Sequence, residues 1–218
     1  MGTRIFAIRI GNRYGPEYED YLNYKLPNIT WIRKPYDKKV LYQWNKLFLM
    51  DLDIDEPIVV IDIDILLIND YMKLFEYPIN KNEFVSIHAW WGDTLKPTYT
   101  MNGGFQKFYP KNCKYIFQKF IKNPLYWQQH YIKNGTTRGP VNGEQYFVED
   151  SVKEKLILKL VPSKWVCRFK NEYDKNWLAQ LNVKYPGDYA YIDQFNPEIK
   201  LVHYNQYNHL PPIPLIRA

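Results

Sequence analysis

Cysteine is scarce in this chain of 218 residues, which contains only Cys113 and Cys167. Small secreted domains depend on several disulfides, and a structural zinc site needs closely spaced cysteine or histidine ligands. Two widely separated cysteines fit neither pattern. The composition therefore excludes a disulfide scaffold and favours a reducing compartment.

Long apolar segments are also missing. The longest apolar run, residues 58–68, carries Asp62 and Asp64 in its middle, whereas a membrane-spanning helix needs about 20 apolar residues. The short apolar stretch near the N-terminus is interrupted by Arg9 and lacks the small-residue cleavage site of a signal peptide. We therefore expect a soluble, cytoplasmic protein without a transmembrane segment.

Aromatic residues are abundant, at 17% of the chain with 20 tyrosines, and lysine plus arginine outnumber aspartate plus glutamate by 29 to 23. Tyrosine and tryptophan rings serve in a core, or stack on sugars or bases. The net charge of +6 favours a polyanionic partner, namely nucleic acid, a membrane surface or a small phosphorylated ligand, unless it belongs to a solvated lysine-rich surface. Composition leaves these alternatives open.

Strand and helix signals alternate along the chain. The run at 58–61 has four consecutive branched apolar residues, which is typical of a central strand covered on both faces. Further strands are predicted at 3–10, 28–33, 83–88, 99–109, 156–160 and 199–204, and helices from 16 onward and at 38–51, 70–75, 112–121 and 143–155. This alternation predicts an α/β sandwich with a mainly parallel central sheet. We expect one domain over residues 1–208, followed by a proline-rich tail at 209–218 that resembles a linker to a further domain.

Two carboxylates end the buried strand. Asp62 and Asp64 follow it directly, and a carboxylate resists leaving water unless it is paired or coordinated. In extended backbone, residues two apart share a face at about 6 to 7 Å, so both side chains can converge on one cation. Mg²⁺ and Mn²⁺ favour such oxygen ligands. The alternative is a pair of turn or capping residues, which the flanking Ile63 and Ile65 do not favour.

The segment Asp62-Ile63-Asp64 resembles the DxD motif of GT-A nucleotide-sugar glycosyltransferases. Four further features occur in the order of that family: a helix with Lys46, then Asn102-Gly103-Gly104-Phe105, Gly143-Glu144-Gln145 and Lys200-Leu201-Val202-His203-Tyr204. The likeness covers most of the chain and is nearest to compact retaining, glycogenin-like enzymes and to the glycosyltransferase domains of large algal (chlorella) viruses. It implies a GT-A, Rossmann-like α/β/α sandwich. The chain departs from glycogenin-like enzymes in lacking their Gly and Lys after the late histidine.

The resemblance implies a metal site and a donor site. Asp64 and His203 would be direct ligands of Mn²⁺ or Mg²⁺, and Asp62 would hold a metal-bound water or the ribose. The residues implied to hold the base, the phosphates and the sugar of the donor are Arg9, Arg13, Tyr14, Lys46, Asn102, Gly103 and Gly104. Plainer interpretations remain: Lys46 as a solvated helix residue, His203 as an ordinary imidazole, and Asn102 to Gly104 as a β-bulge.

The resemblance also implies a catalytic pair. Glu144 would act as a nucleophile, or stabilise an oxocarbenium-like transition state on the sugar face opposite the leaving group. Gln145 would bind sugar hydroxyls. Glu144 equally fits an ordinary acid in the first turn of a helix. One ring of the pair Trp90 and Trp91 is a further candidate for stacking on a sugar.

The function implied by these features is metal-dependent transfer of a hexosyl group from a UDP-sugar to a glycan or glycoprotein acceptor, with retention of configuration. A viral chain would act in the host cytoplasm. Two alternatives remain. A metal-dependent nucleotidyltransferase also uses paired aspartates, but it usually has a Gly-Ser motif, which the sequence lacks. A nucleic-acid-binding module would suit the basic charge, yet no motif supports it, and we expect no nucleic-acid partner.

Overall fold

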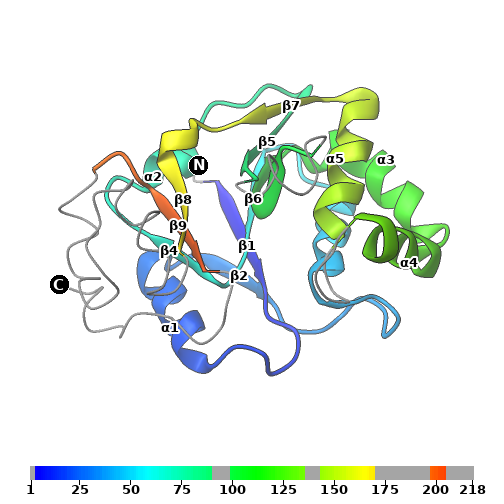
Figure 1. The fold of residues 1–218 in the computed structure, drawn as a ribbon, viewed down its shortest axis with the longest axis horizontal. Helices are drawn as coiled ribbons and strands as arrows, with labels where there is room; N and C mark the ends of the chain where they lie inside the picture. Colours follow the sequence, from blue (N-terminus) through cyan, green and yellow to red (C-terminus); the bar gives the residue numbers. More distant parts are fainter. Residues whose placement is uncertain (1–2, 90–98, 136–142, 170–196, 205–218) are drawn as a thin grey trace.

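The computed structural model describes residues 3–89, 99–135, 143–169 and 197–204. Their centre is a six-stranded sheet in the order β2-β1-β3-β6-β5-β7 (Figure 1). Its strands are β1 (Arg4–Ile8), β2 (Ile29–Ile32), β3 (Ile58–Ile61), β5 (Glu83–His88), β6 (Met101–Phe108) and β7 (Ile157–Leu160). All run in one direction except β6, which is antiparallel to both neighbours. The predicted α/β sandwich with a mainly parallel sheet is confirmed.

Helices cover both faces of this sheet. Along β3 the side chains alternate, so that Val59 and Ile61 enter one apolar layer while Ile58 and Val60 enter the other. The first layer is completed by α1 (Pro16–Lys25) and α2 (Met72–Glu76), and the second by the 3₁₀ helix η1 (Tyr42–Asp51) with α3 (Pro110–Ile121), α4 (Pro124–Gly135) and α5 (Glu144–Lys155). Figure 1 shows α3, α4 and α5 gathered on one side of the sheet and α1 on the other. No helix in the described ranges has both the length and the apolar character needed to cross a membrane.

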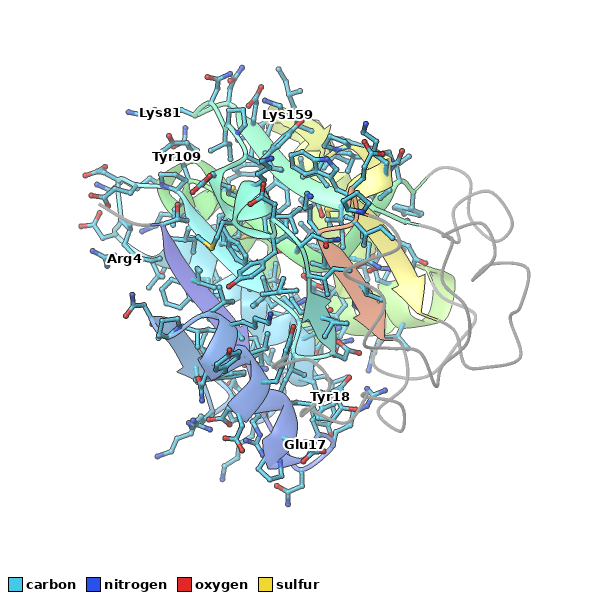
Figure 2. The ribbon with its side chains drawn as sticks, turned by 90° about the vertical axis from the view of Figure 1, so that its left-hand side faces the viewer. Arg4, Glu17, Tyr18, Lys81, Tyr109 and Lys159 are labelled. Carbon is cyan, nitrogen blue, oxygen red and sulfur yellow. The ribbon has the colours of Figure 1, made fainter. Side chains whose placement is uncertain are left out.

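The strands β2 and β7 are the two edges of the central sheet. Figure 2 shows Glu17 and Tyr18 of α1 at one end of the molecule, and Lys81 and Lys159 at the other. Lys159, on β7, forms an ion pair with Glu83 at the start of β5.

A second, three-stranded sheet has the order β4-β9-β8. It consists of β4 (Ile65–Leu67), β8 (Val166–Phe169) and β9 (Leu201–Tyr204). Strand β9 is antiparallel to β4, and Ile65 lies directly opposite His203. Because β4 follows β3 after a short bend, this pairing carries a histidine from late in the sequence to the end of the central strand.

A bulge interrupts β6. In its register with β5, Ser86 lies opposite Gln106 but Ile87 lies opposite Asn102, so residues 103–105 have no partner on β5. The hydroxyl oxygen of Ser86 is 2.8 Å from the carbonyl oxygens of both Asn102 and Phe105, which braces the two ends of the bulge. The bulge that the sequence allowed as a plainer interpretation is therefore present, and it lies beside the end of β3.

The predicted helix at 38–51 is only partly right. The helix begins at Tyr42 and is a 3₁₀ helix throughout. The side chain of Asn45 gives a physical reason, because its Nδ2 donates to the carbonyl oxygens of Val40, at 3.3 Å, and Tyr42, at 2.8 Å. Local side-chain bonds of this kind compete with α-helical backbone pairing.

Three other features were missed or misplaced. Helix α4 begins at Pro124, three residues after the end of α3, and the sequence pattern did not predict a helix there. Strand β8 is short and lies in a separate sheet. Asp70, predicted as the N-cap of α2, forms an ion pair with Lys73 instead, and Tyr71 takes the N-cap position. The tail at 209–218 and the pair Trp90 and Trp91 lie outside the described residues.

Candidate functional site

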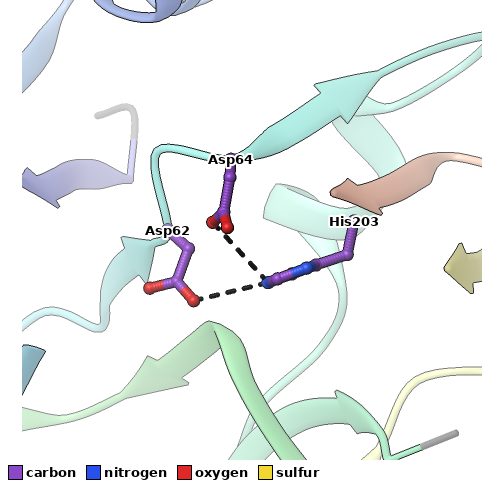
Figure 3. Close-up of side chains that lie close together, drawn as sticks. All are labelled: Asp62, Asp64 and His203. Atoms are coloured by element: carbon purple, nitrogen blue, oxygen red, sulfur yellow. Dashed lines mark hydrogen bonds and ion pairs between the residues drawn. The ribbon is translucent and has the colours of Figure 1, made fainter. Parts of the chain in front are cut away.

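Three side chains from three segments converge at the end of β3 (Figure 3). Asp62 follows β3, Asp64 precedes β4, and His203 lies on β9. The Nε2 atom of His203 is 3.4 Å from Oδ2 of Asp62 and 3.8 Å from Oδ1 of Asp64. One ligand atom from each residue lies within 4.8 Å of the other two. Two carboxylates and an imidazole at these separations form a donor set for one metal ion.

The backbone between Asp62 and Asp64 bends, whereas the sequence suggested that it would be extended. Residues 63 and 64 form a bend rather than a continuing strand. The side chain of Ile63, 5% exposed, belongs to the apolar core, and the backbone N–H of Asp62 donates to the carbonyl oxygen of Gly104 at 2.9 Å. The carboxylates of Asp62 and Asp64 therefore converge because the chain turns between two anchored points.

The charges of the cluster influence one another. Burial raises the pKa of Asp62, but the positive charges of Lys46 and His203 outweigh burial and lower this pKa to about 2. Burial raises the pKa of Asp64, and His203 only partly opposes this effect. Burial would lower the pKa of His203, but the carboxylates of Asp64 and Asp62 raise it above the ordinary histidine value. The site therefore attracts positive charge.

Lys46 links this cluster to the bulge in β6. Its side chain, on η1, is only 2% exposed, which excludes the plain interpretation of a solvated lysine. The Nζ atom forms an ion pair with Asp62 and donates to the carbonyl oxygen of Gly103 at 2.8 Å. Burial lowers the pKa of Lys46, but Asp62 and Glu144 outweigh it and raise the pKa. One ammonium group thus holds the end of β3 and the bulge together.

The two glycines of the bulge are packed against different side chains, His203 beside Gly104 and Glu144 beside Gly103. A Cβ on Gly104 would lie 2.5 Å from Cδ2 of His203 and 2.9 Å from Oδ1 of Asn102, distances that real Cβ atoms do not show. A Cβ on Gly103 would lie 3.1 Å from Oε2 of Glu144. Asn102 holds the turn, because its Oδ1 accepts a hydrogen bond from the backbone N–H of Gly104 at 2.6 Å. Glycine is needed at 104 because the imidazole occupies the space of a side chain.

Glu144 and Gln145 reach the same bulge from the first turn of α5. Oε1 of Gln145 accepts from the backbone N–H of Gly103 at 3.1 Å, and Oε1 of Glu144 accepts from Nε2 of Gln106 at 3.1 Å. Glu144 is 3% exposed, and burial raises its pKa although Lys46 opposes this. Glu144 does lie in the first turn of α5, as its plainer interpretation expected, but its side chain is buried rather than solvated.

The first loop contributes Tyr14 to the cluster. Its hydroxyl donates to Oδ2 of Asp64 at 2.9 Å, and burial together with the charge of Asp64 raises the pKa of Tyr14. The guanidinium of Arg13 lies 5.7 Å from the centre of the Tyr14 ring. Arg9 is in a different situation: it forms an ion pair with Glu19 of α1 and donates to the carbonyl oxygen of Tyr14 at 3.5 Å.

The structure therefore brings most of the predicted residues together around the bulge: Tyr14, Lys46, Asp62, Asp64, Asn102, Gly103, Gly104, Glu144, Gln145 and His203. Arg9 and Arg13 contact Tyr14 of the first loop instead, Arg9 at its carbonyl oxygen and Arg13 at its ring. Sequence reasoning missed Glu19, which pairs with both Arg9 and Arg33, because an acidic residue on a polar helix looks solvated. It also missed Gln106, which the sequence pattern does not distinguish from the other polar residues of β6, Asn102 and Lys107.

A separate cavity of about 430 Å³ lies between α3, α4 and α5. Its lining includes Lys119, Lys155, Tyr115, Trp127 and Glu154. Two of its lysines have partners: Lys119 pairs with Glu154 and lies 5.2 Å from the Trp127 ring centre, and Lys155 lies 4.8 Å from that of Tyr115. The cavity is at the C-terminal end of α5, about 15 Å along the helix from Glu144, so it is distinct from the cluster.

Comparisons with known proteins give no match to any protein-family model and none among curated protein sequences. Solved structures do match. The glycosyltransferase GlyE of Streptococcus pneumoniae TIGR4 has a TM-score of 0.57 at 13% identity, over 95% of this chain and 56% of GlyE. The galactosyltransferase LgtC, in complex with donor and acceptor sugar analogs, has a TM-score of 0.51 at 11% identity, over 93% of this chain and 87% of LgtC. The bifunctional glycosyltransferase WbbM has a TM-score of 0.52 at 12% identity, over 95% and 46%.

The chain thus spans about half the length of GlyE. Identities this low carry information about the fold alone. What the chain shares with these structures is the GT-A fold, the α/β/α sandwich predicted from the order of its motifs.

Proposed function

We propose that this chain is a glycosyltransferase that moves a hexosyl group from a UDP-sugar to a glycan acceptor, with a divalent metal and with retention of configuration. The observation that carries the proposal is one juxtaposition. The Asp62, Asp64 and His203 cluster, the bulge at Gly103 and Gly104, and the buried carboxyl group of Glu144 all meet at the carboxyl end of β3 in the central sheet. Ligands of open α/β sheets bind in this position, beyond the ends of the strands.

The donor set fits Mn²⁺ or Mg²⁺. Ligand atoms around one such ion, each at about 2.1 Å from it, lie about 3 to 4 Å from one another, and the distances of 3.4 and 3.8 Å from His203 fall in this range. Oxygen ligands suit both ions and the imidazole suits Mn²⁺ better. We assign Asp64 and His203 as ligands, with Asp62 as a third ligand or as the partner of a metal-bound water. Such an ion, when bound, neutralises charge on a departing diphosphate.

The residues of this chain define where the donor sugar would lie. The bulge presents backbone without side chains, and Glu144 lies directly behind Gly103, so a sugar over the glycines would have this carboxyl group on one face. In its ionised form the carboxylate would stabilise positive charge that develops on the sugar carbon, or form a covalent bond with it. Gln145 holds the bulge through its Oε1, and we assign its Nε2 to sugar hydroxyls.

The nucleotide is assigned to the first loop. Tyr14 already contacts Asp64, so a base or ribose placed beside its ring would be adjacent to the metal ligands. Arg13 carries positive charge next to that ring, and Arg9 supports the loop from behind through the Tyr14 carbonyl. We assign Arg13 and Tyr14 to direct nucleotide contact and Arg9 to holding the loop. A nucleotidyltransferase is less well supported, because the third member of the described cluster is a histidine rather than a carboxylate.

A glycan or glycoprotein acceptor follows from the donor assignment, and the residues at 209–218 are proposed as a linker to a further domain. The net charge of +6 is then explained by a diphosphate donor rather than by nucleic acid.

A screen of nucleotides tests the proposal. UDP with Mn²⁺ is expected to raise the melting temperature more than ADP or GDP with Mn²⁺, because the loop around Tyr14 is assigned to uridine. A panel of UDP-hexoses with radiolabelled sugars then identifies the donor by metal-dependent hydrolysis or transfer. Equal shifts with all three nucleotides would remove the uridine assignment, and no turnover of any nucleotide sugar would remove the reaction.

A further inference from the structure

Gln106 is a polar residue in an apolar position. It lies on β6 directly opposite Val60 of β3, and directly opposed residues share a face of the sheet. That face belongs to the apolar layer beneath α5, where Val60, Phe108 and Phe147 are completely buried. Gln106 is also 0% exposed. Packing alone would favour leucine or methionine here.

The amide of Gln106 has a single described hydrogen-bond partner, which is Glu144. Nε2 of Gln106 is 3.1 Å from Oε1 of Glu144. The other amide atom, Oε1 of Gln106, is buried and has no hydrogen-bond partner within the described part of the chain. An unpaired buried amide oxygen destabilises the folded protein, because it loses its hydrogen bonds with water and gains none in return. A residue that carries this cost in the core is not explained by stability.

The surroundings of Glu144 explain the need for a donor. Its carboxyl group is 3% exposed and lies against Gly103, where a Cβ would be 3.1 Å from Oε2. The charged groups that act on it are Lys46 of η1, which favours the carboxylate, and Asp62, which disfavours it. The ammonium of Lys46 is already engaged with Asp62 and with the Gly103 carbonyl. Gln106 therefore supplies a donor dedicated to this carboxylate.

We propose that Gln106 is a positioning residue for Glu144: its amide fixes the carboxyl group behind the Gly103–Gly104 bulge and favours the ionised form. This inference rests on the proposed function, in which that carboxylate faces the donor sugar. Gln106 itself does not touch the sugar, because Glu144 and the bulge lie between them. Its contribution therefore concerns turnover rather than donor binding.

The substitution Gln106→Met tests this role, since methionine has nearly the shape of glutamine but no donor. The expected result is a higher pKa of Glu144, measured by NMR on protein with ¹³C-labelled glutamate carboxyls, the signal being assigned with Glu144→Gln. This readout does not need activity. In transfer assays, kcat is expected to fall about ten-fold at neutral pH with little change in KM for the donor, because a hydrogen bond to a charged group is lost, and the acid limb of the pH profile is expected to move upward.

Gln128→Met is the matched control. Gln128 is 2% exposed, but its amide bonds only to backbone groups of Lys39, Leu41 and Pro124. The substitution Gln128→Met is expected to lower the free energy of unfolding and to leave the pKa of Glu144 and kcat unchanged. If Gln106→Met does not fold, the wild-type protein still decides: the side-chain ¹⁵N–¹H signals of Gln106 are expected to titrate together with Glu144.

An unchanged pKa of Glu144 in Gln106→Met, or side-chain signals of Gln106 that do not follow Glu144 in the wild type, would overturn the inference. The proposed function fails in a different way. A pKa that shifts as expected in a protein that turns over no nucleotide sugar would leave the Gln106–Glu144 pairing intact and remove the transferase reaction.

Discussion

The imidazole of His203 fills the space that a side chain on Gly104 would need. A Cβ at Gly104 would lie 2.5 Å from Cδ2 and 2.9 Å from Nε2 of the imidazole. The two residues come from different sheets, Gly104 from the bulge in β6 and His203 from β9. A glycine at this point is therefore a requirement of the cluster, because any side chain would push the imidazole away from Asp62 and Asp64. A substitution at Gly104 is therefore expected to disturb metal binding.

Gly104→Ala is expected to weaken Mn²⁺ binding about ten-fold or more, since groups that position a metal ligand typically contribute this much to affinity. Calorimetric titration of Mn²⁺ in the presence of UDP measures the effect. Gly103→Ala is the matched control, because its added methyl group would meet Glu144 and Gln145 rather than His203. Equal Mn²⁺ affinity of Gly104→Ala and the wild type would show that His203 is not a ligand.

Lys46→Met is expected to lower the free energy of unfolding by about 2 to 4 kcal/mol. The reason is that it leaves the charge of Asp62 largely buried without its partner. Urea denaturation followed by circular dichroism gives this value. Lys73→Met removes a lysine from the exposed pair with Asp70, whose side chains are 56% and 62% exposed, and is expected to change stability by less than about 1 kcal/mol. Similar losses in both variants would contradict the buried role of Lys46.

Glu19 is expected to make stability depend on acid pH. Its hydrogen bonds with Arg33 and Arg9 overcome burial and lower its pKa from 4.5 to about 2. A lowered pKa in the folded state means that the contribution is complete above pH 4.5 and is lost as the pH falls toward 2. The difference between these values corresponds to about 3 kcal/mol at neutral pH, as an upper bound.

The measurement for Glu19 compares the free energy of unfolding of the wild type and Glu19→Gln between pH 7 and pH 2. The two curves are expected to be furthest apart at neutral pH and to converge in the acid range. Asp20→Asn, at the neighbouring exposed position of α1, serves as the control and should run parallel to the wild type. A constant gap down to pH 2 would mean that the ion pairs of Glu19 do not stabilise the fold.

Much of the architecture followed from local patterns. The branched apolar run of β3 could only be a buried strand, and the acidic residues after it had to be compensated, so the position of Asp62 and Asp64 at the carboxyl end of that strand was predictable. The alternation of strands with helices gave the layered fold. The order of the motifs then added Lys46, Glu144 and His203, which no local pattern would have brought together.

Other features depend on tertiary contacts that leave no trace in the local sequence. The bend at residues 63 and 64 exists because Ile63 is anchored in the core, and not because of a turn residue. The pairing of Glu19 with Arg9 and Arg33 links a helix to two loop ends, and the contact between Gln106 and Glu144 joins β6 to α5.

The proposed function requires that this site bind a uridine diphosphate through a metal held by Asp62, Asp64 and His203. Calorimetric titration of UDP into the wild type and into Asp64→Ala, each with and without Mn²⁺, tests it most directly, with the exposed Asp70→Ala as a control for folding and charge. We predict that the wild type and Asp70→Ala bind UDP only when Mn²⁺ is present, and that Asp64→Ala shows no Mn²⁺-dependent binding. Unchanged Mn²⁺-dependent affinity for UDP in Asp64→Ala would mean that Asp64 does not hold the metal through which UDP is proposed to bind.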